Sequence, residues 1–465
     1  ATQASGLGEV AAATAHEVRS VSSQFGWFGL FAILLKAYSM GAGTYTGIEA
    51  VSNGLPILRE PRVQTGRRTM VYMGTSLAIT AAGLLVAYLL FRVQPVDGKT
   101  LNAVLLEKLT ATWSHGGGAF VFTALISATA LLFIAAQAGF LDGPRVLANM
   151  ALDRWFPTRF ANLSDRFVTQ NGILLMGGAA VLAMVVTGGS VSTLLVLYSI
   201  NVFITFCLSQ LGMVLHWWRE RATEAAWRRK LAINGFGLAL TTFILASLTV
   251  VKFHEGGWAT LLVTGLLVAT AFAIKRHYNG VAAQLHRLDV VVEVAESTAG
   301  LIPVHLPFDP LQRTAVLLIN GYNGLGLHTA LHVPRLFGET FRNFVFLQVG
   351  TVDAGNFKGA AELEALRTHT AAEAGRYAAW ARAHGYGAAT FIALGHDVVS
   401  EVMQLAAKAR ELFPNSVFFA GQLQFARETR LTRLLHNHTA TTLQQRFFAA
   451  SLPFVVLPIR VGPNA

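Results

Sequence analysis

The chain has a single cysteine and few charged residues, and these two shortages exclude several classes of protein. One cysteine among 465 residues cannot form a disulfide within the chain, and a zinc site would need other ligands. Only 13% of the residues are charged, whereas soluble domains carry about 25%. No segment before Trp27 resembles a signal peptide. With 53% hydrophobic residues and so little charge, the chain is expected to lie in a membrane.

The hydrophobic residues gather in seven long runs, and a helix needs about 20 mostly apolar residues to cross a bilayer. We expect spans at 27–57, 70–92, 119–141, 170–188, 193–218, 231–251 and 258–274. The expected domain order is an extracytoplasmic segment (1–26), a transmembrane domain (27–280), a linker (281–310) and a cytoplasmic α/β domain (311–465).

The net charge of +11 fits membrane topology better than nucleic-acid binding, because the excess lies in short loops between the apolar runs. With seven spans, one side of the membrane receives sixteen Lys and Arg residues and the other receives five. The positive-inside rule therefore predicts that the richer side, with the C-terminal region, is cytoplasmic and the N-terminus external. An external start implies preceding spans, so we expect about five spans to be missing from this chain.

The first apolar run is unusually polar inside, reading AYSMGAGTYTGIEAVSNGLP over 37–56. Glycines break helices in secondary transporters, and the freed carbonyls then bind ions or polar substrates. An intramembrane carboxylate such as Glu49 marks an ion or proton pathway. We therefore predict a binding site whose residues are Gly43, Thr44, Tyr45, Thr46 and Glu49. The alternative is close helix packing through the glycines, with Glu49 paired to a neighbour.

This run also carries a resemblance to a known family. TGIEA (46–50), with the following SNG and LREPR, resembles the sixth helix of the amino acid–polyamine–organocation superfamily. More narrowly it is similar to the KUP-type and KimA-like potassium transporters, and the similarity continues through 142–157 and 197–213. The resemblance implies a LeuT-like inverted-repeat fold in which the seven runs are helices six to twelve of an N-terminally truncated chain.

The same resemblance implies a function. It predicts proton-coupled potassium uptake by a multi-pass protein of the bacterial inner membrane, with potassium held by Thr46, Glu49 and Tyr198. The transported K⁺ and H⁺ are then substrates, and no cofactor is expected. Two alternatives stay open: an amino-acid permease of the same superfamily, and a membrane-anchored module that senses a nucleotide. No nucleophile elbow, acidic dyad or CxxC motif is present, so an enzyme is not expected.

From residue 314 onward, short apolar runs alternate with helical stretches. Strands are expected at 314–320, 343–350, 389–395, 416–421 and 453–461, with helices at 325–341, 359–384, 397–412 and 427–446. Near-continuous apolar strands alternating with helices are typical of a parallel sheet covered on both faces. The expected fold is doubly wound, like a universal-stress-protein domain.

A nucleotide site is the functional expectation for this domain. NGYNGLGLHTA (320–330) follows a strand and opens a helix, so Gly321, Asn323 and Gly324 are candidate phosphate ligands. The motif is not a clean GxGxxG, and glycines after a strand often only make the turn, so that alternative stays open. The resemblance implies inhibition by cyclic di-AMP and a homodimer formed through this domain. Histidines at the HNH spacing of 436–438 would point the same way only on a strand, and this segment is expected to be helical. His436 and His438, together with His396, are therefore interpreted as solvated side chains and not as metal ligands.

Overall fold

The computed structural model describes residues 7–41, 51, 54–55, 58–288, 309–356, 359–424, 435 and 438–460. Contacts divide the chain into two compact units. The first comprises Ala1–Asp142 with Met176–Leu267, and the second comprises Gly143–Leu175 with Val268–Ala465. The segment between two membrane helices therefore belongs to the same unit as the C-terminal domain.

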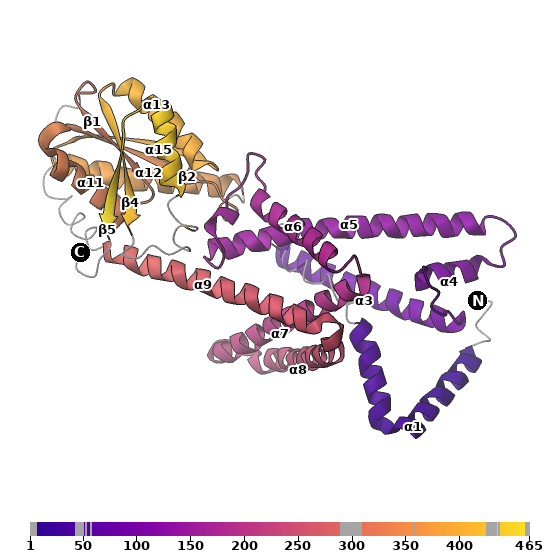
Figure 1. The fold of residues 1–465 in the computed structure, drawn as a ribbon. Coiled ribbons are helices and arrows are strands. Elements are labelled where there is room, and N and C mark those ends of the chain that lie inside the picture. The colour runs from indigo at the N-terminus through magenta and orange to yellow at the C-terminus, as the bar shows by residue number, and fades with distance from the viewer. Residues whose placement is uncertain are drawn as a thin grey trace. The chain divides into compact units, whose positions relative to one another are not determined.

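In the residues that the structure describes, the N-terminal part is built from helices and the turns between them (Figure 1). Its helices are α1 (Leu7–Gly41), α3 (Arg62–Leu90), α4 (Leu101–Thr110), α5 (Gly117–Leu152), α6 (Gln170–Val186), α7 (Val191–Arg219), α8 (Trp227–Lys252) and α9 (Trp258–Leu288). Short 3₁₀ turns follow at Thr158–Phe160 and Glu220–Ala222, and a π turn at Phe253–Gly257 joins α8 to α9.

Several of these helices could cross a membrane. Within the described residues, four helical stretches are long and apolar enough: Arg62–Leu90, Gly117–Leu152, Val191–Ala222 and Trp227–Leu288. The last contains α8, the π turn and α9, while Gln170–Val186 is a shorter apolar helix. Their outward side chains are largely apolar, for example Phe133, Val185 and Leu266. Such surfaces suit a lipid environment, where every backbone polar group must be satisfied within the helix.

Two helix bounds differ most from the expected ranges. The helix α1 begins at Leu7, well before the apolar run, and changes direction at Gly26, whose φ of 70° lies in the left-handed region. The helix α9 continues to Leu288, into the range expected to be a linker. In both places the helix is longer than the apolar stretch, because bilayer thickness limits the apolar length and not the helix itself.

The C-terminal part is an α/β domain with a five-stranded parallel sheet, drawn in orange to yellow in Figure 1. The strands are β1 (Thr314–Ile319), β2 (Asn343–Thr351), β3 (Gly387–Gly395), β4 (Ser416–Gln424) and β5 (Phe454–Arg460). They lie in the order β3-β2-β1-β4-β5. Leu317 of β1 pairs with Phe346 on one side and Phe419 on the other. The chain reverses its winding between β1 and β4, which makes their carboxyl ends a topological switch point.

Helices cover both faces of this sheet. They are α11 (Gly324–Phe337), α12 (Ala360–Ala383), α13 (Val398–Leu412) and α15 (His438–Ala449), with a 3₁₀ turn at Gly338–Thr340. Alternate side chains of each strand point to opposite faces. Leu317 and Phe346 pack with α11 and α12, whereas Val316 and Leu347 pack with α13 and α15. The expected doubly covered parallel sheet is therefore present.

Candidate functional site

The structure describes only part of the predicted membrane site. Gly43, Thr44, Tyr45, Thr46 and Glu49 lie outside the described residues. Tyr198 is described and lies in the first half of α7, with 44% of its surface exposed. The geometry around this tyrosine is therefore the part of the site that can be built from the residues upward.

The start of α7 is fixed by a side-chain cap. The hydroxyl of Ser190 accepts a hydrogen bond from the backbone N–H of Thr193 at 3.4 Å, which satisfies one of the free amides at a helix start. Behind Tyr198, the fully buried Ile200 and Phe203 face the protein interior. Phe203 packs with Ile244 and Leu248 of α8. The buried side of α7 thus sets the direction in which Tyr198 emerges on the other side.

The π turn between α8 and α9 packs against the same part of α7. A Cβ atom on Gly257 would lie 3.2 Å from Ile200 Cδ1 and 2.8 Å from the Lys252 carbonyl, so only glycine fits there without movement. Gly256 has a φ of 108°, which side-chain-bearing residues rarely adopt. The turn is also closed by an ion pair of 2.5 Å between Lys252 and Glu255. Both glycines serve the close approach of the turn to α7.

A polar side chain on α7 joins this helix to α9. Thr264 Oγ1 donates a hydrogen bond to Asn201 Oδ1 at 2.7 Å, and Asn201 Nδ2 donates to the Leu197 carbonyl. Asn201 lies three residues beyond Tyr198, so the two side chains emerge on neighbouring positions of one helix face. Asn201 therefore acts in interhelical hydrogen bonding, beside the one predicted potassium ligand that the structure describes.

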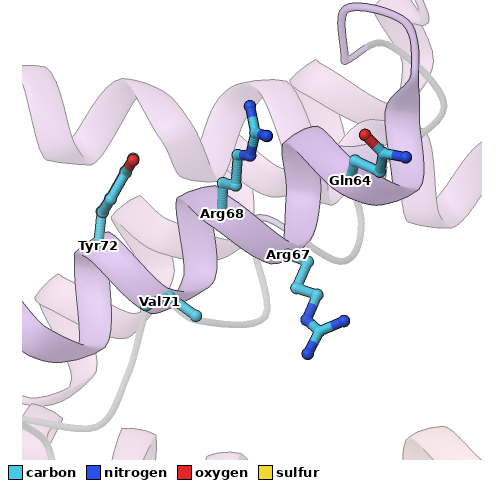
Figure 2. A pocket seen from close by; sticks show the side chains of 5 residues that line it. All are labelled: Gln64, Arg67, Arg68, Val71 and Tyr72. Carbon is cyan, nitrogen blue, oxygen red and sulfur yellow. The ribbon is translucent and has the colours of Figure 1, made fainter.

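A shallow pocket of about 420 Å³ lies along the start of α3, at Gln64, Arg67, Arg68, Val71 and Tyr72. Figure 2 shows Arg67 and Arg68 pointing to opposite sides of the helix. Two cations that diverge in this way do not form a common anion site. Their position at a helix end matches the cationic flanks typical of membrane spans.

A larger cavity, of about 520 Å³, lies at the carboxyl ends of β1, β2 and β4, where ligands bind in open α/β sheets. Apolar side chains form most of its walls, among them Leu318 and Leu347 of the sheet and Val402 and Leu443 of the helices α13 and α15. The polar lining residues are all neutral: Asn320, Asn323, Thr329, Thr351, Gln422 and Thr439. This lining suits a ligand that is uncharged and hydrogen-bonding where it meets these walls.

The predicted phosphate loop enters this cavity only in part. Asn323 lines it, and its Oδ1 accepts from the Gly326 N–H at 3.0 Å, so Asn323 caps α11. Gly321 has a φ of 75° and serves the turn. At Gly324, a Cβ atom would collide with the backbone of Leu288, the last residue of α9. The close approach of α9 explains this glycine, and the start of α11 is covered by protein.

Sequence reasoning missed the side chains that hold this loop from α12. Tyr377 donates through its hydroxyl to the Gly321 carbonyl at 3.1 Å and accepts from the Asn323 N–H at 3.2 Å. Glu373 accepts from the Tyr322 N–H and from Gln348 Nε2 at 2.7 Å. Burial raises the pKa of Tyr377 well above its usual range, so the hydroxyl stays protonated. No local pattern marks these residues, because their partners lie more than 20 positions away in sequence.

The histidines do not form a metal centre in the described structure. His436 lies outside the described residues, and His396 Nε2 lies 2.8 Å from Asp165 Oδ1. Among the residues that the structure describes, no group of three or more His, Cys, Asp or Glu side chains is placed to hold a metal ion.

Comparison with known proteins assigns the membrane part to a family. Residues 6–272 match the family described as amino acid permease. The chain belongs to the amino acid permease family. It is also 32% identical, over 272 residues, to "Potassium transporter KimA" of Bacillus subtilis (strain 168). That match covers 58% of this chain and 44% of the relative, so the chain spans less than half of the relative's length.

Family membership agrees with the apolar helices described above. Membership in a permease family and these helices fit a membrane-embedded, multi-pass protein and point away from an enzyme. The expected superfamily and a helical membrane domain of this family are therefore confirmed.

Proposed function

We propose that the whole protein imports potassium coupled to protons across a bacterial inner membrane, with the α/β domain in the cytoplasm. The observation that carries the proposal is the 32% identity to a potassium transporter over 272 residues. The alignment spans more than half of this chain, which fits a shared membrane domain. The KUP-type motif TGIEA (46–50) lies within residues 6–272, the range that matches the amino acid permease family.

In this proposal, Thr46 and Tyr198 contribute oxygen ligands to K⁺, together with backbone carbonyls near Gly43–Gly47. Hydroxyl and carbonyl oxygens suit a hard monovalent cation. Glu49 balances the charge of the ion or exchanges the proton. Tyr198 meets one requirement in the described structure, because its side chain is exposed on α7 and is not buried in the helix contact with α8.

The test is uptake of ⁸⁶Rb⁺ into vesicles that contain the full-length protein, with and without an imposed proton gradient. We expect Glu49→Gln to abolish the gradient-driven uptake, because the neutral side chain neither exchanges a proton nor balances a cation. Glu49→Asp, which keeps the carboxylate, should retain part of it. Unchanged uptake by Glu49→Gln would remove Glu49 from the mechanism.

Amino-acid transport is the second candidate, because the matching family model is described as amino acid permease. In that case the broken first run would hold the α-carboxylate and α-amine of the substrate, with no ion cage. Uptake of a mixture of ¹⁴C-labelled amino acids by the same vesicles distinguishes the two. Amino-acid uptake without ⁸⁶Rb⁺ uptake would replace the potassium proposal.

For the α/β domain we propose a universal-stress-protein-like role, with cyclic di-AMP as the regulator and a homodimer formed through this domain. The neutral, hydrogen-bonding lining of the cavity supports a site for the base of such a nucleotide. Calorimetry of the detergent-solubilised protein with cyclic di-AMP tests it. Gln422→Ala should weaken binding by about 2- to 10-fold, the worth of one neutral hydrogen bond. If the wild type gives no binding heat, the proposal that cyclic di-AMP binds this domain is contradicted.

A further inference from the structure

The carboxyl edge of the sheet holds the connection between α5 and α6. Asn162 of this connection and Asp353, which follows β2, form an isolated antiparallel bridge. The Ala354 N–H donates to the Ala161 carbonyl at 3.0 Å. Gly355 completes the contact, because a Cβ atom there would lie 3.0 Å from Leu152 Cδ1. Backbone pairing and a close glycine contact thus join two segments far apart in sequence.

A second contact lies at the end of β3. His396, the residue after β3, has Nε2 2.8 Å from Asp165 Oδ1, and its ring meets Phe167 edge to face at 6.0 Å. The Asp165 side chain is 96% exposed, so this pair contributes little stability. Within the segment itself, the buried Phe160 and Ala161 pack with Ala151 at the end of α5 and with Phe156, so the segment carries its own small apolar core.

Helix α9 also contacts the α5–α6 connection. Lys275 Nζ donates to the Asp153 carbonyl at 2.6 Å and lies over the Trp155 ring. The buried Tyr278 accepts from the Thr158 N–H at 3.4 Å. Ten residues further along α9, Leu288 packs with Leu423 and Ile459 of the sheet. One helix therefore contacts both the sheet and the segment that the sheet holds.

We propose that residues 352–356 with His396 form a docking surface for the α5–α6 connection, residues 153–167, and that the α/β domain restrains the membrane helices through it. The effect on uptake rests on the proposed transport function. Thr351 lines the cavity and directly precedes Val352, whose N–H donates to the Gly395 carbonyl at 2.9 Å. Occupancy of the cavity therefore acts on the strand end that carries the docking residues.

Docking would act on transport because α5 and α6 flank the held segment. The backbone pairing at Asn162 and the α9 contacts at Asp153 and Thr158 hold the segment between the two helices. A movement of either helix would have to carry this segment along or break these contacts. The docked form is thus a restraint on those helix ends. A restraint of this kind changes an equilibrium by a coupling factor of about 5- to 150-fold in typical allosteric proteins.

The test joins the two sides covalently in the full-length protein. Asp165→Cys and His396→Cys are combined in a Cys207→Ser background, which removes the one native thiol. The two side chains meet only at their ends, with Nε2 and Oδ1 2.8 Å apart, so a direct disulfide would be too short. A short bis-methanethiosulfonate reagent, which spans this gap and is removed by reductant, should therefore cross-link the two thiols in high yield. The matched control pairs Asp165→Cys with Glu411→Cys, at the far end of α13, and should not cross-link. Absence of the first cross-link would overturn the docking surface.

Two readouts then test the restraint. Amide hydrogen exchange at 143–152 and 170–175, the helix ends beside the held segment, should slow at least about fivefold on cross-linking and recover with reductant. Uptake of ⁸⁶Rb⁺ should fall by a similar factor. Unchanged exchange overturns the restraint whether or not the protein carries rubidium. Slowed exchange in a protein that shows no uptake even when reduced would support the restraint and reject the transport function.

Discussion

Thr264 donates a hydrogen bond of 2.7 Å from its hydroxyl to the side-chain oxygen of Asn201, and so joins α9 to α7 three residues beyond Tyr198. The contact lies beside the turn where Gly256 and Gly257 let α8 and α9 meet α7. The position of the predicted potassium ligand therefore depends on a hydrogen bond between two helices and on two glycines.

Replacing Thr264 by valine should weaken this arrangement. Interhelical hydrogen bonds in membranes average about 0.6 kcal/mol, so we expect a loss of that order in the free energy of unfolding. Thermal unfolding in lipid nanodiscs measures it, with Thr264→Ser as the control that keeps the hydroxyl. Equal melting temperatures for Thr264→Val and wild type would show that the bond contributes nothing.

Tyr198→Phe tests the predicted ligand itself. Removing the hydroxyl should raise the KM for ⁸⁶Rb⁺ by about 10- to 100-fold, because an interaction with a charged group is worth about 1.5–3 kcal/mol. The ring remains, so packing on α7 should change little. Tyr72→Phe on α3 is the control, since Tyr72 is also an exposed tyrosine of an apolar helix but was not predicted to bind the ion. An unchanged KM for Tyr198→Phe would exclude its hydroxyl from the site.

The strands of the α/β domain could be predicted because each is an almost continuous apolar run. The expected strand 416–421 and the observed β4, Ser416–Gln424, begin at the same residue. Its end was missed because the polar pair Gln422 and Gln424 interrupts the apolar run while still pairing with β5. Backbone hydrogen bonding extends a strand beyond the point where its side chains stop being buried.

Helix lengths in the membrane part were less predictable for a physical reason. Residues 7–25 are rich in alanine but not apolar enough for a span, so hydropathy alone gave no helix there. Alanine favours helix whether or not a bilayer is present. The long-range contacts, such as Asn162 with Asp353 and Tyr377 with Gly321, leave no signal in local sequence. They arise only when the sheet brings distant segments together.

Tyr377 offers a test of how the loop 320–323 is held. Tyr377→Phe leaves the part-buried Asn323 N–H and Gly321 carbonyl without this partner, at an expected cost of about 0.5–1.5 kcal/mol. Hydrogen exchange at 320–326 should therefore speed up markedly in the full-length protein. Tyr386→Phe is the matched control, since its ring packs on Phe344 away from the loop. Equal exchange in both variants would mean that the hydroxyl does not hold the loop.

His328 gives the α/β domain an expected dependence on pH. Burial, with a smaller contribution from His332, lowers the pKa of His328 in α11 below its ordinary 6.5. A lowered histidine pKa means that the unfolded chain binds more protons than the folded one as pH falls below about 6.5. Stability is then highest above this pH and decreases as pH falls toward the folded pKa.

The measurement compares hydrogen exchange of α11 in wild type and His328→Gln at pH 7.5 and 5.5, so that the intrinsic pH dependence of exchange cancels at each pH. We expect similar protection of the two proteins at pH 7.5, and weaker protection of the wild type than of the variant at pH 5.5. His332→Gln serves as the control, because His332 contributes only the smaller, Coulombic part of the shift. The two proteins are compared by the ratio of their exchange rates in α11. If this ratio is the same at pH 7.5 and 5.5, protonation of the His328 ring does not cause the loss of stability.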